Sequence, residues 1–109
     1  MIARFWSACA TQTQSQAYLQ YFSRAVLPEL RGFEGFIAHT VLTRPIPSET
    51  EIVVITIWQS LAAIDAFANP DREAAVVSPE AAAHLARYDR RVRHFEVASS
   101  DGMFVGQHA

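Results

Sequence analysis

Trp58 stands where a predicted buried strand passes directly into a helix, a place where a small α/β domain tends to hold a ligand or carry out a reaction. Residues 52–57 are all apolar or Thr, and their β-branched side chains favour a pleated strand. Ser60 can accept a hydrogen bond from a free backbone N–H and begin a helix, which the apolar spacing of residues 61–68 continues. Pro70 ends that helix, because proline has no N–H to donate. Trp58 is therefore a candidate for binding or catalysis.

Two other predicted strands carry side chains that could take part in chemistry. Arg4 and Trp6 alternate onto one face of the first strand, and His94 and Glu96 share one face of the last. Histidine changes charge near neutral pH, so His94 is a candidate base or proton relay. An alternative role for His94 is a hydrogen bond at a subunit interface.

A metal site built on the same strand is a competing hypothesis. His94 and Glu96 form a His-x-Glu pair that presents two ligands on one side, and His39 or His84 could supply a third. The sequence spacing fixes neither of these as the third ligand, so we expect no metal. His39 could also lie on either face of its strand.

Composition narrows the class of protein. The chain has 109 residues, of which 50% are hydrophobic and 18% charged, so we expect one folded domain rather than a disordered chain. No apolar run approaches the roughly 18 residues that cross a bilayer, so no membrane association is expected. The apolar N-terminus is short and interrupted by Arg4, unlike an export signal, and the expected compartment is the cytoplasm. The single cysteine, Cys9, permits no internal disulfide and no cysteine cluster.

The charges exclude further functions. All nine basic residues are arginine, so a Schiff-base lysine and a phosphate-binding Walker lysine are both absent. The net charge of −2 gives no general attraction to nucleic acid. Four arginines crowd residues 87–93, and we interpret them as a solvated face or a set of ion pairs between subunits.

The remaining elements follow from local signals. Residues 2–8 alternate as a strand, and Thr11 and Gln14 have the capping-box spacing of a helix start. That helix should be kinked or shortened by Pro28 and closed by a left-handed Gly32. The other predicted elements are a strand over 35–44, a turn over 45–48, a helix from Ser78 to about Arg90, a strand over 91–98 and a tail from Ser99.

This order predicts an α+β fold of the ferredoxin-like βαββαβ type, with four antiparallel strands and the helices on one face. One domain should span residues 1–98, followed by a C-terminal tail over 99–109.

Strand parity divides the sheet residues into two sets. We expect Phe5, Val53, Ile55, Ile57, Phe95 and Val97 to face the helices. The opposite set is Arg4, Trp6, Val54, Thr56, Trp58, Val92, His94 and Glu96. Because two tryptophans would not be left in water, we expect this second face to be covered by another subunit in a homodimer.

The chain also resembles a known family. The opening IARFWS, the GF of the second strand, the segment ITIWQSLAAIDAF and the closing PEAAAHLARYDRRVRHFEV are similar to antibiotic biosynthesis monooxygenase (ABM) domain proteins, up to about Val97. The most specific element of this resemblance is the junction from Trp58 to Leu61. The resemblance implies a dimeric α/β barrel and an oxygenase that oxidises polycyclic phenols with neither metal nor flavin. Haem degradation is a second branch of the family, and other members have no known activity.

The resemblance suggests roles for individual residues. Trp58 and His94 are the catalytic candidates. Arg4, which would favour a substrate anion, joins Trp6, Thr56, His84 and Tyr88 as substrate-binding candidates. No cofactor is implied, because a deprotonated polyphenol can reduce oxygen directly.

Two departures from the family pattern bear on the choice of function. Family members often place an Asn on the first strand beside the barrel Trp, and here Ser7 is the nearest polar substitute. The haem-degrading branch requires an axial His on the helix after the central strand, whereas His84 lies in a later predicted helix. We therefore expect an ABM-type monooxygenase acting on a small aromatic or quinol-like molecule. The alternative is a dimer of the same fold that binds a small molecule without turnover.

Overall fold

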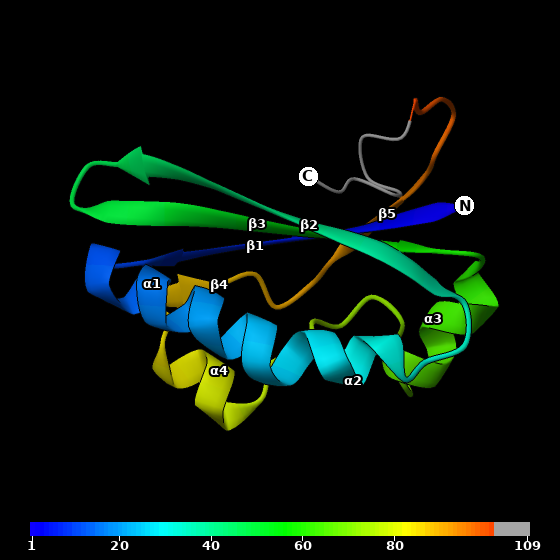
Figure 1. Ribbon diagram of the computed structural model, residues 1–109, viewed down its shortest axis with the longest axis horizontal. Coiled ribbons are helices and arrows are strands. Elements are labelled where there is room, and N and C mark those ends of the chain that lie inside the picture. The colour runs from blue at the N-terminus through cyan, green and yellow to red at the C-terminus, as the bar shows by residue number, and fades with distance from the viewer. Residues whose placement is uncertain (102–109) are drawn as a thin grey trace.

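A computed structural model describes residues 1–101, and it forms one antiparallel sheet with every helix on the same face (Figure 1). The strands are β1 (Ile2–Ala10), β2 (Phe36–Ile46), β3 (Glu49–Trp58), β4 (Arg87–Tyr88) and β5 (Arg93–Glu96). The helices are α1 (Gln12–Tyr21), the π-helical η1 (Phe22–Val26), α2 (Leu27–Arg31), α3 (Leu61–Phe67) and α4 (Pro79–Ala83).

The sheet confirms the predicted α+β fold with its antiparallel, ferredoxin-like arrangement. β1 lies between β3 and the last part of the chain, and β2 forms a hairpin with β3 at the opposite edge. β4 and β5 both pair with β1, at different points along it, so together they fill the fourth strand position. The four-stranded plan is thus present, with its last strand interrupted.

The predicted helix starts are confirmed by their caps. Thr11 Oγ1 accepts from the Gln14 backbone N–H at 3.1 Å, while the Gln14 side chain accepts from the Thr11 N–H, which completes the capping box. Ser60 and Ser78 each accept from the backbone N–H three residues on. These polar residues therefore fix where the helices begin.

The predicted helix from Ser78 to Arg90 is wrong after Ala83. The chain leaves α4 at His84, and the residues that follow pair with the free edge of β1. The Ala86 N–H donates to the Cys9 carbonyl at 2.8 Å, and the Asp89 N–H donates to the Ser7 carbonyl at 2.9 Å. An open sheet edge needs partners for its backbone groups, and this requirement outweighs the local helical pattern.

One smaller prediction, the left-handed Gly32, also needs correction. Gly32 does close α2, but with a right-handed φ of −79°. The left-handed glycine is Gly35, at φ +92°, where an added Cβ would stand 2.5 Å from the Ala63 Cβ. Pro28 lies in the first turn of α2, and the α-helix before it is interrupted by the π-helical segment Phe22–Val26, in keeping with the predicted irregularity.

The assignment of the two sheet faces is wrong and has to be reversed. Trp6, Val54 and Trp58 belong to or pack against the core that the helices cover. Phe95 lies on the opposite face and is 48% exposed. Polar side chains at Arg4 and Thr56 suggested an uncovered face, yet both are buried beneath the helices. The predicted reason for covering the Trp face with a second subunit therefore disappears.

Within the described residues, ion pairs account for two of the arginines between 87 and 93. Arg87 pairs with Glu49 at 2.7 Å, and Arg91 pairs with Asp71 at 2.5 Å.

No helix in residues 1–101 is long and apolar enough to cross a membrane. Residues Ser99 to Asp101 form no helix or strand, and the rest of the predicted tail lies outside the described residues.

Candidate functional site

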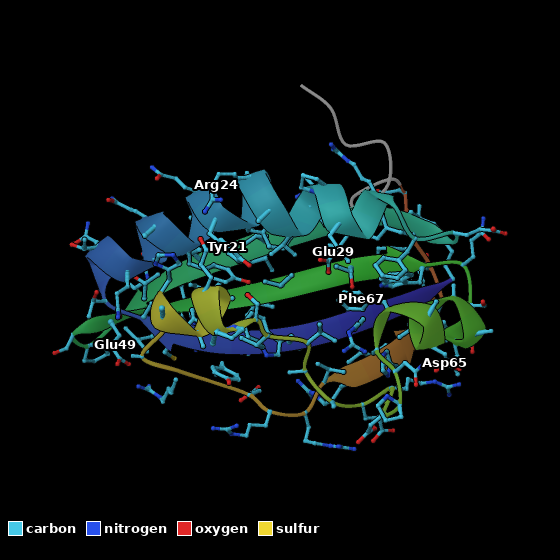
Figure 2. The ribbon with its side chains drawn as sticks, turned by 90° about the horizontal axis from the view of Figure 1, so that it is seen from below. Tyr21, Arg24, Glu29, Glu49, Asp65 and Phe67 are labelled. Atoms are coloured by element: carbon cyan, nitrogen blue, oxygen red, sulfur yellow. The ribbon has the colours of Figure 1, made fainter. Side chains whose placement is uncertain are left out.

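A cavity of about 170 Å³ lies between the helix-covered face of the sheet and the helices. Strands β1 and β3 supply its floor through Arg4, Trp6, Val54 and Thr56. The helical side is mainly aromatic and aliphatic. Its members include Tyr18, Tyr21, Phe22, Ala25, Leu30 and Phe67. Figure 2 views the molecule from the helical side, with Tyr21, Glu29 and Phe67 labelled around this region.

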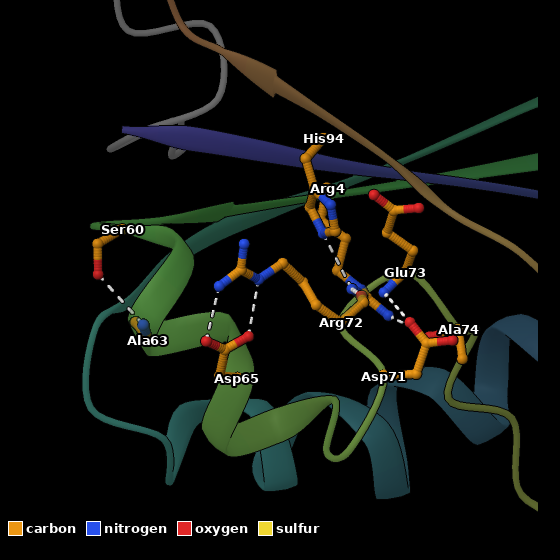
Figure 3. Close-up of polar contacts among 9 residues, drawn as sticks. All are labelled: Arg4, Ser60, Ala63, Asp65, Asp71, Arg72, Glu73, Ala74 and His94. Atoms are coloured by element: carbon orange, nitrogen blue, oxygen red, sulfur yellow. Dashed lines mark hydrogen bonds and ion pairs between the residues drawn. The ribbon is translucent and has the colours of Figure 1, made fainter.

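Arg4 is the buried charge of the cavity, with only 5% of its surface exposed. Its guanidinium donates to the Arg72 carbonyl at 2.6 Å and to the Ala74 carbonyl at 2.8 Å (Figure 3). It also lies over the Phe67 ring, 5.5 Å from the ring centroid. No carboxylate within residues 1–101 pairs with it, and burial lowers its pKa to about 10. A buried cation without an acidic partner favours an anionic ligand.

His94 does not line the cavity but lies against Arg4. Its Nε2 atom is 3.0 Å from the Arg4 Nη1 atom, and a guanidinium can only donate, so Nε2 accepts. Burial lowers the pKa of His94, and the charge of Arg4 lowers it further. The imidazole is therefore neutral near pH 7 and holds the guanidinium in place.

Trp58 is fully buried, at 0% exposure, and lies behind the cavity. Its indole Nε1–H donates to Thr56 Oγ1 at 2.9 Å, and its ring stacks on Phe67 with centroids 5.5 Å apart. Thr56 and Phe67 both line the cavity. Trp58 thus orients a hydroxyl and an aromatic wall and has no surface left for a substrate.

Trp6 is the tryptophan that faces the cavity. Its Nε1–H donates to the Asp89 carbonyl at 2.8 Å, which fixes the ring. The rings of Tyr18 and Tyr88 lie on it, with centroid distances of 6.1 Å and 6.2 Å. Tyr88, predicted to bind substrate, supports Trp6 from outside the cavity.

Tyr18, on α1, is a functional candidate that the sequence did not single out. It lines the cavity at 4% exposure, and its hydroxyl bonds to none of the described residues. Burial raises its pKa, with a further contribution from Tyr21, so the phenol keeps its proton and can donate it in a hydrogen bond. In the sequence, the signal for this candidate was a tyrosine among the otherwise apolar residues on one face of the first helix.

Tyr21 and His84 form a second supporting pair. The Tyr21 hydroxyl lies 2.7 Å from Ser78 Oγ, and the His84 ring lies 5.9 Å from the Tyr21 ring. Tyr21 lines the cavity and His84 does not.

Of the predicted site residues, the structure brings Arg4, Trp6 and Thr56 to the cavity. The other four, Trp58, His84, Tyr88 and His94, each contact a residue that lines it.

Residues 1–101 provide neither an axial haem ligand at the cavity nor a set of metal ligands. No histidine of residues 1–101 lines the cavity, so haem has no axial ligand there, and the space is far smaller than a porphyrin. The described residues contain no group of three His, Cys, Asp or Glu side chains that could hold a metal ion. His39 contacts the Phe22 ring on the helical face, 5.3 Å between centroids, away from the strand of His94.

Comparison with known proteins places the chain in a family. The sequence model of the antibiotic biosynthesis monooxygenase (ABM) family matches residues 2–78. A Bacillus cereus protein, named as a candidate antibiotic biosynthesis monooxygenase, has a similar crystal structure, with a TM-score of 0.61 and 20% identity. That similarity covers 92% of this chain and 93% of the other, and it supports the fold alone. No curated protein matches the chain significantly. The family match, spanning most of the chain, shows that this protein belongs to the antibiotic biosynthesis monooxygenase family.

Proposed function

We propose that this protein is a monooxygenase that needs no cofactor and oxidises an aromatic phenol or quinol in the cavity over Arg4. The observation that carries the proposal is the buried Arg4 guanidinium, which has no acidic partner among the described residues and faces an aromatic-walled space. Such a site stabilises a phenolate against its neutral phenol, because the guanidinium stays charged at neutral pH. Membership of the family supports the same reaction.

The reaction balances without an added reductant. The phenolate gives one electron to O₂, and the substrate radical and superoxide then combine in a new C–O bond. The resulting hydroperoxide loses water as its O–O bond breaks and the same ring carbon releases its proton, which leaves a carbonyl. One oxygen atom enters the product, the other becomes water, and the substrate supplies all four electrons.

The residues of the cavity have distinct parts in this scheme. Arg4 lowers the energy of the anion, and Trp6 and Phe67 pack against the ring. Tyr18 donates a hydrogen bond to oxygen as negative charge develops on it. Glu29 is the one carboxylate among the described residues that line the cavity, and it is exposed, so it can pass the substrate proton to water.

The protein is also proposed to act as a homodimer, joined through the sheet face opposite the helices. That face exposes Leu42 at 46% and Phe95 at 48%. Phe95 meets Phe5 edge to face, with centroids 6.4 Å apart. Exposed apolar side chains on a sheet face that carries no helix favour association with a second sheet.

Oxygen uptake by the purified protein tests the proposed reaction. We would supply hydroquinone, 1,4-dihydroxynaphthalene or an anthrone with EDTA present, and compare wild type with Arg4→Met. Arg31→Met is the matched control, because Arg31 is exposed on α2 and does not line the cavity. We expect Arg4→Met to lower the rate at least about 100-fold and Arg31→Met to retain it. Equal rates in the two variants would contradict the proposal.

A second function, binding without turnover, is favoured by one observation. The only carboxylate at the cavity is exposed, and His94 is directed to Arg4, so no buried base lines the space among residues 1–101. Saturable binding of these phenols without oxygen uptake, with the ligand recovered unaltered, would identify this function.

A further inference from the structure

The volume of the cavity limits how much of a ligand it can enclose. It measures about 170 Å³, close to the roughly 150 Å³ apolar protein cavity that takes up one benzene molecule. A fused two-ring or three-ring system needs correspondingly more space. The family resemblance implies polycyclic phenols, so the dimensions of this cavity disagree with that implication.

The walls of the cavity are held from behind, which opposes enlargement. Trp6 is tied through its indole N–H to the Asp89 carbonyl, and Tyr21 through its hydroxyl to Ser78. Phe67 stacks on the fully buried Trp58. Moving any of these aromatic walls outward would break a hydrogen bond or a packed ring contact.

The polar groups inside the cavity specify the other half of the ligand. Arg4 is a buried cation without a carboxylate partner in the described residues, and Tyr18 lines the cavity with a hydroxyl that bonds to none of them. No fully buried side-chain oxygen or nitrogen of the described residues lacks a partner, so this hydroxyl is accessible rather than sealed in the core. Both are donors, and so both favour a ligand that carries acceptor oxygens. An anionic oxygen satisfies Arg4 better than a neutral one.

We propose that the cavity accepts a single aromatic ring bearing one anionic oxygen and excludes fused ring systems. As a statement about substrate it rests on the proposed function and names the class as single-ring quinols, such as hydroquinone, which would give hydroxybenzoquinone and water. As a statement about ligand size it rests on the cavity alone.

Binding of a graded ligand series tests this inference without reference to turnover. Quenching of Trp fluorescence would be titrated with benzoate, 2-naphthoate and anthracene-2-carboxylate, which differ only in ring number, and with 4-nitrophenolate. The last probe separates preference for a phenolate from preference for a carboxylate. We expect the single-ring ligands to bind at least about tenfold more tightly than 2-naphthoate, and anthracene-2-carboxylate to give no saturable binding.

Three variants test whether this cavity is the one measured. Ala25→Leu fills the space and should abolish benzoate binding, while Ala83→Leu makes the same change on α4, outside the cavity, and should not. Val76→Ala shortens an exposed lining side chain and should improve 2-naphthoate binding.

The possible outcomes separate the two proposals. Equal or tighter binding of the fused ligands by wild type, or no saturable binding of any probe, would overturn the size inference. Single-ring binding without oxygen uptake on any quinol would leave the size inference standing and contradict the proposed reaction.

Discussion

His94 accepts a hydrogen bond from Arg4 across the β1–β5 pair, with 3.0 Å between Nε2 and Nη1, and so belongs to the support of the cavity rather than to its lining. This contact requires a neutral imidazole, because an imidazolium has no lone pair to offer. The charge state of His94 therefore controls how firmly the buried guanidinium is held. His94, a candidate base from the sequence, thus contacts the cation from outside the cavity.

The first prediction concerns stability at mildly acidic pH. The folded-state pKa of His94 is lowered by burial first and by Arg4 next, against about 6.5 in an unfolded chain. Arg72 lowers it as well, whereas Glu73 and Asp65 raise it. The unfolded chain then binds the proton more readily, so the unfolding free energy should fall as the pH drops below about 6.5. Urea unfolding between pH 7.5 and 5 measures this.

A substitution separates His94 from other groups that titrate in the same range. His94→Gln keeps an acceptor for Arg4 but cannot be protonated, so it should lose less stability than wild type as the pH falls. His39→Gln is the comparison variant: burial also lowers the pKa of His39, so this substitution should reduce the pH dependence by a separate share, at a position that does not contact Arg4. An undiminished pH dependence in His94→Gln would refute the linkage.

The second prediction distinguishes support from catalysis at Trp58. Because Trp58 is fully buried, Trp58→Ala should destabilise the fold by about 3–5 kcal/mol and lose activity through unfolding. Trp58→Phe keeps most of the ring stacking on Phe67 and should retain oxygen uptake within a few-fold. Activity would be compared with thermal unfolding of each variant. A folded Trp58→Phe protein with no activity would show that the indole takes part in the chemistry.

The sequence predicted the fold well because its signals were local. The caps at Thr11, Ser60 and Ser78 depend on residues within one helical turn, and the structure contains all three. The end of α4 could not be predicted in this way. Residues 84–90 read as helix until the free edge of β1, some 80 residues earlier in the chain, offers them backbone partners.

The site was predicted less well than the fold because burial depends on tertiary packing. Strand parity correctly grouped Arg4, Trp6, Thr56 and Trp58 on one face, but parity does not say which face the helices cover. The polar residues Arg4 and Thr56 favoured the wrong assignment, in which this face lies away from the helices. Tyr18 was missed because a tyrosine in a helix stripe looks like core until the absence of a hydrogen-bond partner is seen.

The third prediction addresses the proposed homodimer. Phe95→Glu places a charge on the exposed sheet face beside Phe5 and should give a monomer in sedimentation velocity experiments, while wild type sediments as a dimer. Leu61→Glu is the control, since Leu61 is a comparably apolar exposed residue that begins α3 on the helical side. A Phe95→Glu dimer would place any interface elsewhere on the molecule.

The fourth prediction tests Tyr18 directly. Its hydroxyl bonds to none of the described residues, so Tyr18→Phe should leave the melting temperature nearly unchanged. A hydrogen bond from this phenol to an anionic ligand contributes about 1.5 kcal/mol, so the affinity for 4-nitrophenolate should fall about tenfold. Tyr88→Phe makes the same chemical change outside the cavity, against Trp6, and should bind with wild-type affinity. If Tyr88→Phe weakened binding and Tyr18→Phe did not, the ligand would lie on the outer side of Trp6, toward β4. The paired substitutions thus decide which side of one tryptophan holds the ligand.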